Sequence, residues 1–384
     1  MSDRQPLLTV EYTDPVNGVK GYLVIDTLVN GVSAGGMRVR KGLTKEEVVR
    51  LAQTMTDKFA VIDVPIGGAK SGLDYDPAAP DKLEVMKRFA EAIAPLLREV
   101  YAVGEDLGTR EEEVTEVAAH IGLPSSVAAV PRRLGMGDEA LQRIASGLAL
   151  TYDGFPMAEM ATGYGIMAAT REALTFAGLT MAGASAAVQG FGSVGGSTAH
   201  FLAKEGTKVM AVADAQGTIL CQDGLEVGKL LEKRDKAGII DRTDLPGEYQ
   251  LLDREAVLYL PVHVLVPAAV KDVITEENAD RVQARTIVEA ANIPVTEGAE
   301  KILYDKGIIA VPDFVANAGA AAFYIDLLLG RTEPTLESIL SGLVERIGGA
   351  THQVLTASRD EGILPRAAAK RLAREKLATL SAAK

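Results

Sequence analysis

The sequence predicts an α/β fold of two domains, the second built around a parallel sheet covered by helices on both faces. The first observation is length: 384 residues exceed what a single hydrophobic core usually serves. The second is the alternation of short apolar segments with helical segments from about residue 166 onward, which is typical of a doubly wound sheet. The third is a glycine-rich turn between one such strand and the helix after it.

The first domain is predicted to combine strands with helices. Gly21–Asp26 is rich in β-branched and aromatic residues and favours a strand, and Asn30–Gly31 favours a tight hairpin turn. Thr44–Glu47 has the spacing of a capping box, which predicts the start of a helix that continues through Lys58. A second such box at Thr109–Glu112 predicts another helix start.

Periodicity defines the remaining elements. A helix is expected to start at Asp81, because apolar residues recur at helical spacing after it. In the second domain we expect strands at Ala184–Gln189, Lys208–Ala213, His263–Pro267, Thr286–Glu289 and Gly307–Val311, and helices at Ile166–Phe176 and Val194–Lys204. We therefore predict a first domain of residues 1–150, a second of 151–334, and C-terminal helices, 335–384, that return to the first.

Composition and charge exclude several classes of function. The formal net charge of −12 disfavours nucleic-acid binding, since a phosphate backbone requires a basic surface. No apolar run approaches the roughly 20 residues of a membrane span, and the N-terminus lacks the apolar core of a signal peptide, so we expect a cytoplasmic protein without membrane contact. The single cysteine, Cys221, and four scattered histidines match no metal-ligand spacing, so no metal site is expected.

A glycine-rich turn indicates a dinucleotide cofactor and a Rossmann-type domain. Gly190–Gly195 lies between a predicted strand and a predicted helix, and Asp214 stands 24 residues after Gly190, at the end of the next strand. Gly190 permits the tight turn, Gly192 lets the pyrophosphate approach the backbone, and Gly195 lets helix and strand pack closely. The cofactor-binding residues expected in this turn are Gly190, Phe191, Gly192, Ser193, Val194 and Gly195.

Asp214 predicts which cofactor is preferred. Its carboxylate could accept hydrogen bonds from the adenosine ribose hydroxyls and would repel a 2′-phosphate, which favours NAD over NADP. A nearby basic residue such as Lys208 could offset that repulsion, so NADP stays open. A nicotinamide cofactor implies hydride transfer, so the first domain is expected to hold and activate a substrate.

Two lysines and one aspartate in the first domain are candidates for that chemistry. Lys70 is flanked by glycines in Pro65–Gly72, where the backbone has to pass close to a neighbour, and Lys58 has apolar neighbours on its helix. Two ammonium groups close together would lower each other's pKa, and burial would lower it further, as a proton-transfer role requires. Asp106, just ahead of the helix start at Thr109, would be kept ionised by the positive end of that helix.

Short motifs along most of the chain resemble those of the glutamate/leucine/phenylalanine/valine dehydrogenase family. The resemblance runs from about residue 20 to residue 330, in the family's order. The short N-terminus is more similar to the leucine and phenylalanine enzymes, whereas Asp74–Pro77 is more similar to the glutamate enzymes. The other matching motifs are Met55–Lys58, Pro65–Gly72, Glu105–Thr109, Glu159–Gly163, Gln189–Gly195, Glu289–Asn292 and Pro312–Gly319.

The resemblance implies reversible NAD-dependent oxidative deamination of an L-amino acid to a 2-oxo acid and ammonia. It implies that Lys58 binds the substrate α-carboxylate. Lys70 would be the catalytic lysine that activates water, and Asp106 would carry protons to and from the amino group.

For the cofactor side, the resemblance implies that Thr162, Ala291 and Asn292 position the nicotinamide and its ribose. Asn317 would line the substrate side of the cleft. The resemblance also implies a homo-oligomer assembled through the first domain.

Two positions depart from the glutamate-specific members of the family. Those members have a lysine before the glycine pair matched by Gly35–Gly36, and a serine seven residues after the asparagine matched by Asn317. Here these positions are Ala34 and Tyr324, so a glutamate side chain would bring an unpaired charge into the substrate pocket. We therefore expect these positions and the glycine pair to surround a neutral, apolar substrate side chain. The basic residues that could still pair with an acidic substrate are Arg38, Arg40 and Arg110.

Other functions remain open at this point. Glutamate dehydrogenase is the alternative within the family, and the same scaffold could support another dehydrogenase or an imine reductase. A nucleotide-sensing or structural protein without turnover is a third possibility, but it would not need both lysines and the aspartate. The segment Val130–Asp153 matches no motif of the family and has no assigned role.

Overall fold

The computed structural model describes residues 5–382 and separates into two compact units. The first unit runs to Ala145 and includes Leu328–Arg331 and the chain from Ala373 onward. The second unit comprises Ser146–Leu327 and Thr332–Leu372. The predicted boundary between the first and second domains lies close to this observed division.

The C-terminal helices divide between the two units. The elements are α7 (Met157–Phe176), α13 (Leu336–Leu343), a π-helical turn (Val344–Gly348), α14 (Gly349–Glu361) and α15 (Pro365–Ala382). α13, the π-helical turn and α14 pack on α7 of the second unit, and α15 passes into the first unit at Ala373. The prediction that 335–384 returns as a whole is therefore wrong up to Leu372. Gly165 on α7 permits this packing, because a Cβ there would lie 3.2 Å from Ile347.

The first unit is built on a five-stranded mixed sheet. Its strands are β1 (Leu8–Thr13), β2 (Lys20–Ile25), β3 (Ser33–Val39), β4 (Gly67–Leu73) and β5 (Tyr101–Glu105). Its helices include α1 (Lys45–Val61), α2 (Lys82–Ala92), α3 (Ala94–Glu99), α4 (Glu111–His120) and α5 (Ala129–Arg133). The strand order is β1-β2-β4-β3-β5. β3 pairs in parallel with both β4 and β5, and the other two pairs are antiparallel.

The predicted elements of this unit are found, with two differences in detail. β2 and α1 confirm the predicted strand and helix, and Thr44 Oγ1 accepts a hydrogen bond from the N–H of Glu47. Asn30–Gly31 forms a tight turn with both residues at positive φ, but β4 lies between the strands on either side of it. The second capping box is displaced by one residue, since the N–H of Arg110 donates to Glu113 Oε2 (3.0 Å) ahead of α4.

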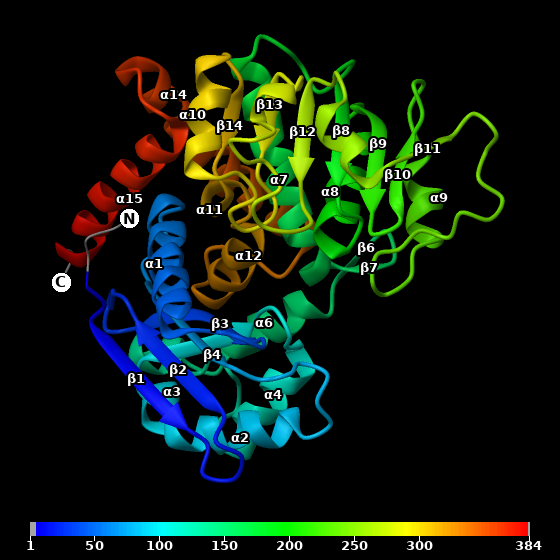
Figure 1. Cartoon of the computed structure of the whole chain (residues 1–384). Coiled ribbons are helices and arrows are strands. Elements are labelled where there is room, and N and C mark those ends of the chain that lie inside the picture. The colour runs from blue at the N-terminus through cyan, green and yellow to red at the C-terminus, as the bar shows by residue number, and fades with distance from the viewer. Residues whose placement is uncertain (1–4, 383–384) are drawn as a thin grey trace. The chain divides into compact units, whose positions relative to one another are not determined.

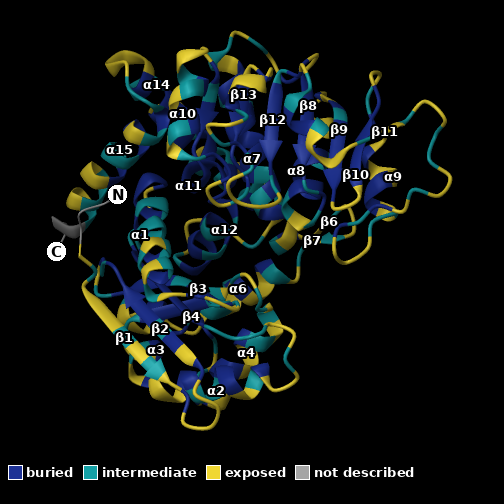
Figure 2. Ribbon diagram, in the orientation of Figure 1, coloured by how far each residue is buried: buried dark blue, intermediate teal, exposed yellow. Residues whose placement is uncertain are grey.

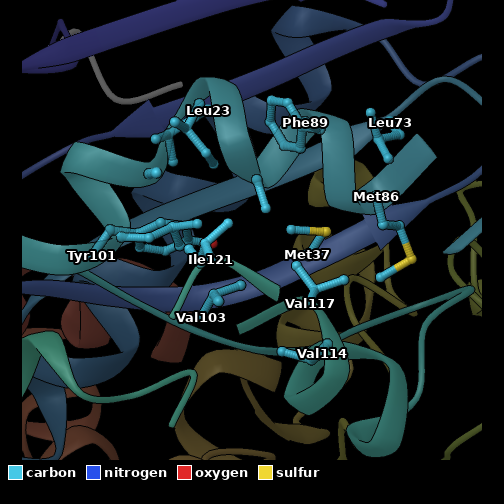
Figure 3. Close-up of a cluster of buried hydrophobic side chains, with 14 of the residues drawn as sticks. Leu23, Met37, Leu73, Met86, Phe89, Tyr101, Val103, Val114, Val117 and Ile121 are labelled. Atoms are coloured by element: carbon cyan, nitrogen blue, oxygen red, sulfur yellow. The ribbon is translucent and has the colours of Figure 1, made fainter. Parts of the chain in front are cut away.

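A buried apolar cluster between the sheet and helices α2 and α4 holds the first unit together (Figure 3). α2 begins after Asp81, as predicted, and contributes the fully buried Met86 and Phe89. Tyr101 of β5 is fully buried as well, and its hydroxyl is hydrogen bonded to Ser71 Oγ of β4 (3.0 Å). The cluster therefore fixes the strands that carry the candidate catalytic residues.

The second unit contains a seven-stranded sheet. Its strands are β8 (Ser185–Gln189), β9 (Lys208–Asp214), β10 (Gly217–Leu220), β11 (Gln250–Leu252), β12 (Val264–Pro267), β13 (Thr286–Val288) and β14 (Ile309–Val311). Helices α8 (Ser193–Lys204), α9 (Val227–Glu232), α10 (Glu297–Asp305), α11 (Asp313–Ala316) and α12 (Gly319–Leu328) accompany them. The order is β11-β10-β9-β8-β12-β13-β14, parallel except at β10 and β11. The predicted strands are confirmed, and α7 begins earlier than the predicted helix start at Ile166.

Both faces of this second sheet are covered (Figures 1 and 2). β8, β12 and β13 are buried along their whole length, which explains why their sequences are continuous apolar runs. On one face, Ala187, Leu265 and Ile287 pack with Val257 and with α10. α7 and α8 pack against the sheet as well, so the arrangement is the doubly wound one that the sequence predicts.

The order of the strands reverses between β8 and β12, and this is where the glycine-rich turn lies. β9 and β10 lie on one side of β8, whereas β12, β13 and β14 lie on the other. Open α/β sheets bind ligands at the carboxyl ends of the strands beside such a reversal. Gly190–Gly195 follows β8 at this point, and Glu289–Asn292 follows β13 at the same edge.

The unassigned segment Val130–Asp153 connects the two units. It contains most of α5, all of α6 (Glu139–Leu148) and β6 (Thr151–Tyr152), which forms a small hairpin with β7 (Phe155–Pro156). The chain leaves the first unit at Ala145, within α6.

Candidate active site

Lys70 and Asp106 lie next to each other in the first unit. Lys70 is in the middle of β4, Asp106 directly follows β5, and Lys70 Nζ is 3.2 Å from Asp106 Oδ2. β3 runs between these two strands, and the side chains meet beside its Gly36. A Cβ on Gly36 would lie 2.8 Å from Asp106 Cβ and 3.2 Å from Lys70 Nζ. A glycine at this position therefore leaves room for the pair to form.

Other glycines of β3 and β4 let neighbouring backbone come close. A Cβ at Gly68 would lie 2.1 Å from the Thr56 nitrogen of α1, and one at Gly35 would lie 1.8 Å from the Ala69 carbonyl oxygen. The expectation that glycines near the lysine mark a close approach is confirmed. Lys58 lies half-buried in the last turn of α1, and its role as a carboxylate ligand stays a prediction.

Arg38 of β3 contacts the same aspartate. Its Nε donates to Asp106 Oδ2 at 2.7 Å, and its Nη1 donates to Glu47 Oε1 at 3.1 Å. Arg40 pairs with the other oxygen of Glu47, and the largely exposed Arg110 pairs with a glutamate of α4. Each arginine considered for an acidic substrate is thus bonded to a carboxylate of the chain itself. No local pattern in the sequence indicated the contact between Arg38 and Asp106.

Burial and neighbouring charges set the ionisation of this group. Burial lowers the pKa of Lys70, and the guanidinium of Arg38 lowers it further against the attraction of Asp106. Burial alone would raise the pKa of Asp106, but Lys70 and Arg38 bring it down to about 2. The pKa of Lys70 is therefore lowered, which is the direction that a proton-transfer role requires, and Asp106 is ionised at neutral pH. The cation that acts on Lys70 is Arg38, while mutual repulsion between Lys58 and Lys70 stays a prediction.

The loop after β5 holds Asp106 in position. Its N–H donates to Thr109 Oγ1 at 2.9 Å, and that hydroxyl lies 2.9 Å from the Met37 carbonyl oxygen of β3. Gly108 has φ +82°, and a Cβ there would lie 2.0 Å from a β3 carbonyl oxygen. Thr109 is therefore used to build this loop, which is why the capping box starts one residue later than predicted.

The glycine-rich turn of the second unit has a geometry suited to a pyrophosphate. Gly190 has φ +93°, and a Cβ at Gly195 would lie 1.9 Å from the Gly190 carbonyl oxygen, so α8 packs directly on the turn. A Cβ at Gly192 would meet no atom of the described residues within 4 Å, so the space beside this backbone is open. No side chain caps the start of α8, whose first N–H groups can serve an anion. These observations fit the three roles expected of the glycines.

A loop that the sequence analysis did not single out touches this turn. Arg234 Nη1 donates to the Gly192 carbonyl oxygen at 2.7 Å, and Arg234 and Ile240 pair across the base of the loop. A Cβ at Gly238 would lie 2.7 Å from the Gly192 nitrogen. Gly238 is the residue that could have indicated this contact from the sequence. Its backbone has φ +81°, a conformation that glycine adopts readily.

Asp214 lies at the end of β9, as predicted, but its carboxylate is already paired. Arg242 donates to both oxygens, from Nη2 to Oδ1 at 2.6 Å and from Nη1 to Oδ2 at 2.8 Å. The N–H groups of Gln216 and Ile240 donate one further bond to each oxygen. Burial would raise the pKa of Asp214, but these donors hold it below its usual value. A basic neighbour that could offset the repulsion of a 2′-phosphate is therefore present, but it is Arg242 rather than Lys208, and the preference between NAD and NADP stays a prediction.

Further candidate cofactor residues gather at the carboxyl edge of the sheet. Asn317 Nδ2 donates to Asn292 Oδ1 at 3.1 Å. A Cβ at Gly319 would lie 2.9 Å from Thr162 Cα, so α12 starts directly against α7. Asn317 is thus hydrogen bonded to the cofactor candidate Asn292, and its place on the substrate side stays a prediction.

Two buried side-chain oxygens in this region have no partner among the described residues. They are Oε1 of Gln189, which precedes the glycine-rich turn, and Oδ1 of Asn317. Buried polar atoms are rarely left unpaired, so a polar ligand is expected beside them. These atoms and the open space at Gly192 fit a nicotinamide dinucleotide.

The remaining predicted substrate residues lie in different units. Ala34 is buried on β3 of the first unit, next to the glycine pair. Tyr324 is half-buried on α12 of the second unit, and its ring contacts Phe323 edge-on. Their part in substrate recognition stays a prediction.

Comparison with known proteins assigns the chain to a family. A model of the Glutamate/Leucine/Phenylalanine/Valine dehydrogenase family matches residues 154–384, and its dimerisation-domain model matches residues 7–121. The chain belongs to the glutamate/leucine/phenylalanine/valine dehydrogenase family. Its members are oxidoreductases that act on the CH–NH2 group of amino acids, so the predicted enzyme class is confirmed.

Curated relatives from archaea support this assignment. The chain is 32% identical over 354 residues to an NADP(+)-dependent glutamate dehydrogenase of Pyrobaculum calidifontis, covering 85% of this chain and 79% of that one. It is 33% identical over 303 residues to glutamate dehydrogenase B of Halobacterium salinarum, covering 78% and 67%.

Solved structures of dehydrogenases share the fold. A hetero-hexameric glutamate dehydrogenase of Thermus thermophilus, in a leucine-bound form, has a TM-score of 0.78 at 27% identity and covers 98% of this chain and 89% of that one. An L-tryptophan dehydrogenase of Nostoc punctiforme, at 18% identity, has a TM-score of 0.67 and covers 98% and 96%. The predicted two-domain α/β fold is confirmed. Within residues 5–382, no helix has the length and apolar character needed to cross a bilayer.

Proposed function

We propose that this family member catalyses the reversible, NAD(P)-dependent oxidative deamination of an L-amino acid with a neutral, apolar side chain. The products would be the 2-oxo acid and ammonia. The observation that carries the proposal is the buried contact of Lys70 Nζ with Asp106 Oδ2, 3.2 Å apart. A turn suited to a dinucleotide, Gly190–Gly195, supports it from the second unit.

The chemistry follows from the ionisation of these two groups. Asp106 is ionised at neutral pH and accepts a proton from the substrate ammonium group. A nicotinamide dinucleotide held at Gly190–Gly195 would supply the acceptor for the hydride of Cα, so that the substrate amine becomes an imine. Lys70, whose pKa is lowered by burial, would act as a neutral amine and take a proton from the water that attacks the imine carbon. Asp106 then returns its proton to the amino group of the carbinolamine. The C–N bond breaks and releases ammonia while the C=O bond of the 2-oxo acid forms and the hydroxyl proton passes to water.

Other residues of the site bind and orient. Lys58 would pair with the substrate α-carboxylate through its ammonium group. Gly190–Gly195 and the start of α8 would hold the pyrophosphate. Asn292 and Asn317, hydrogen bonded to each other, would orient the nicotinamide together with Thr162.

A neutral substrate side chain is supported by the positions that would face it. Ala34 offers no charge, and Arg38 is bonded to two carboxylates of the protein. A substrate carboxylate buried there without a partner would cost several kcal/mol, on the order of the penalty for an unpaired buried charge.

The test is to assay oxidative deamination of leucine, valine, phenylalanine and glutamate side by side at equal enzyme concentration. We expect a higher kcat/KM for at least one apolar amino acid than for glutamate, by about tenfold or more, since each 1.4 kcal/mol gives tenfold. A clear preference for glutamate would contradict the proposed substrate class. Turnover of a 2-oxo acid with NADH but without ammonia would contradict amino-acid dehydrogenation itself.

Glutamate remains the second candidate substrate. The archaeal relatives are named glutamate dehydrogenases, and they match most of this chain. The side-by-side assay decides between the two substrate classes in one experiment.

We further propose that NADP is accepted as well as NAD. Asp214 at the end of β9 is neutralised by Arg242, whose side chain is 18% exposed. This pairing removes the repulsion between Asp214 and a 2′-phosphate. The guanidinium of Arg242 would also lie near the ribose end of the cofactor, which favours a 2′-phosphate. The relative from Pyrobaculum calidifontis is named NADP(+)-dependent, which is consistent with this view.

A homo-oligomer assembled through the first unit is part of the same proposal. The matched model for residues 7–121 is described as a dimerisation domain, and the Thermus thermophilus relative is hetero-hexameric. Light scattering of the purified protein should give a mass that is a multiple of 40.5 kDa, greater than one chain.

A further inference from the structure

Arg38 has no part in the proposed function so far, yet it touches the centre of the candidate site. It lies on β3 two residues after Gly36, and its side chain is 12% exposed. Its Nε and Lys70 Nζ both contact Asp106 Oδ2, at 2.7 and 3.2 Å. No hydrogen bond within the described part of the chain reaches the other oxygen, Asp106 Oδ1. One carboxylate oxygen is therefore held by two cations, and the other is left for a substrate proton.

Glu47 holds Arg38 from the opposite side. Arg38 Nη1 donates to Glu47 Oε1 at 3.1 Å, while Arg40 pairs with Glu47 Oε2. Glu47 belongs to the first turn of α1, where the cap at Thr44 fixes the backbone. Two of the three guanidinium nitrogens of Arg38 are thus bonded to carboxylates from α1 and from the loop after β5.

We propose that Arg38 is the positioning residue of the Lys70–Asp106 pair, anchored by Glu47, rather than a ligand for the substrate. This inference rests on the proposed function. Arg38 fixes the orientation of the Asp106 carboxylate, so that Oδ1 stays available to the substrate amino group. A guanidinium suits this task because it stays charged at any pH at which the enzyme works and donates in a fixed planar geometry.

The permanent charge of Arg38 also acts on the protonation of both partners. It opposes a second positive charge on Lys70 and favours the negative charge on Asp106. Two other titratable groups face this cluster. Tyr101 of β5 interacts electrostatically with Asp106, and Glu47 is hydrogen bonded to Arg38. Without the guanidinium, the pKa of Lys70 and the pKa of Asp106 would both rise. Since the reaction requires neutral Lys70, the acidic limb of the pH profile would move to higher pH.

The experiment compares Arg38→Gln with Arg38→Lys and with the matched control Arg40→Gln. Arg40 pairs with the same glutamate but does not touch Asp106. For Arg38→Gln we expect kcat to fall by about 100-fold near neutral pH, a loss typical of disturbed acid–base catalysis, with KM changed little. The acidic limb of kcat/KM should shift upward by about one pH unit. Arg38→Lys retains the positive charge, so the acidic limb of kcat/KM should return to its wild-type pH. It should restore only part of kcat.

A second readout does not depend on turnover. The pH dependence of Lys70 labelling by acetic anhydride, followed by mass spectrometry, reports the pKa of Lys70 directly. Arg38→Gln should raise that pKa, and Arg40→Gln should leave it unchanged. If the wild-type enzyme oxidises no amino acid, the proposed function fails while the labelling still tests Arg38.

Two results would overturn the proposal. One is a raised KM for the amino acid with an unchanged pH limb, which would make Arg38 a substrate ligand. The other is unchanged Lys70 labelling in a folded Arg38→Gln variant. If Arg38→Gln does not fold, the test uses Glu47→Gln, which removes the anchor of Arg38. This variant is expected to shift the pH limb and the Lys70 labelling in the same direction but less. Unchanged values in Glu47→Gln would count against the proposal.

Discussion

Single glycines decide whether the candidate catalytic pair can form. Lys70 and Asp106 come from strands that are separated by β3, and their side chains meet only because Gly36 presents no Cβ between them. Gly104 stands opposite Gly36 on β5, yet a Cβ there would have no neighbour within 4 Å among the described residues. The two positions therefore form a matched pair for mutation.

Gly36→Ala is expected to inactivate the enzyme, whereas Gly104→Ala is not. The added methyl would lie 2.6 Å from the Glu105 carbonyl oxygen and 2.8 Å from Asp106 Cβ, so the aspartate must move. A displacement of about 1 Å at reacting groups can cost about 100-fold in rate. The measurement is kcat/KM of both variants, with the thermal midpoint as a folding control. Equal activities would show that the close approach at Gly36 is irrelevant to catalysis.

Arg242 is the residue-scale determinant expected for the cofactor. Arg242→Ala removes the guanidinium from the Asp214 carboxylate, which keeps only its two backbone N–H donors, so the repulsion of a 2′-phosphate returns. We expect the ratio of kcat/KM for NADPH to that for NADH to fall by about 10- to 100-fold, since a hydrogen bond to a charged group contributes about 1.5–3 kcal/mol.

Lys229→Ala is the control for that experiment, because Lys229 is an exposed cation on nearby α9 that pairs only with Glu226 in the described structure. Its cofactor ratio should equal that of the wild type. An unchanged ratio in Arg242→Ala would show that this arginine does not act at the ribose end of the dinucleotide.

At the scale of elements, one arginine ties four segments of the second unit together. Arg366, at the start of α15, donates to Glu289 after β13, to Glu300 of α10 and to Asp313 of α11. All four side chains are buried, the arginine the least completely at 11% exposure. Three carboxylates around one guanidinium are a surplus of negative charge, and burial raises the pKa of Glu289 to about 8.

This surplus predicts how stability depends on pH. The pKa of Glu289 is higher in the folded chain, about 8, than the roughly 4.3 of an unfolded glutamate, so folding takes up a proton between these values. Stability should therefore decline as pH rises through that window and level off above it. Glu289→Gln removes the titration and should flatten the decline.

The measurement is the free energy of unfolding of wild type and Glu289→Gln between pH 5 and about 9, by chemical denaturation. Glu337→Gln, an exposed position at the start of α13, serves as the control and should follow the wild type. Parallel curves for wild type and Glu289→Gln would show that Glu289 does not titrate in this range.

For the whole molecule, the prediction of the fold was correct in its main lines and wrong about the C-terminal region. Strands and helices such as β8 and α1 follow from local periodicity and caps, so they could be predicted from neighbouring residues. The tail was predicted to return to the first domain from residue 335, but α13 and α14 pack on α7 instead. That choice depends on small residues of α7, such as Gly165, which no local pattern in the tail reveals.

The residues of the candidate site also divide into those that the local sequence predicts and those that it does not. The backbone geometry at Gly190, Gly192 and Gly195 was predictable because the turn is continuous in sequence and its geometry depends on its own backbone. The partners of Asp106 and Asp214 were not predictable, because Arg38 and Arg242 reach these aspartates only through the tertiary fold.

The sequence by itself determined the family, the α/β fold, the glycine-rich turn and the candidate residues for proton transfer. Those properties depend on residue types and on spacing along the chain. Only the tertiary structure decided which charges stand together, because Arg38 is 68 residues from Asp106 and Arg242 is 28 residues from Asp214. The ionisation of a buried group is set by the side chains that fold against it and by the exclusion of water, and neither is a property of the local sequence.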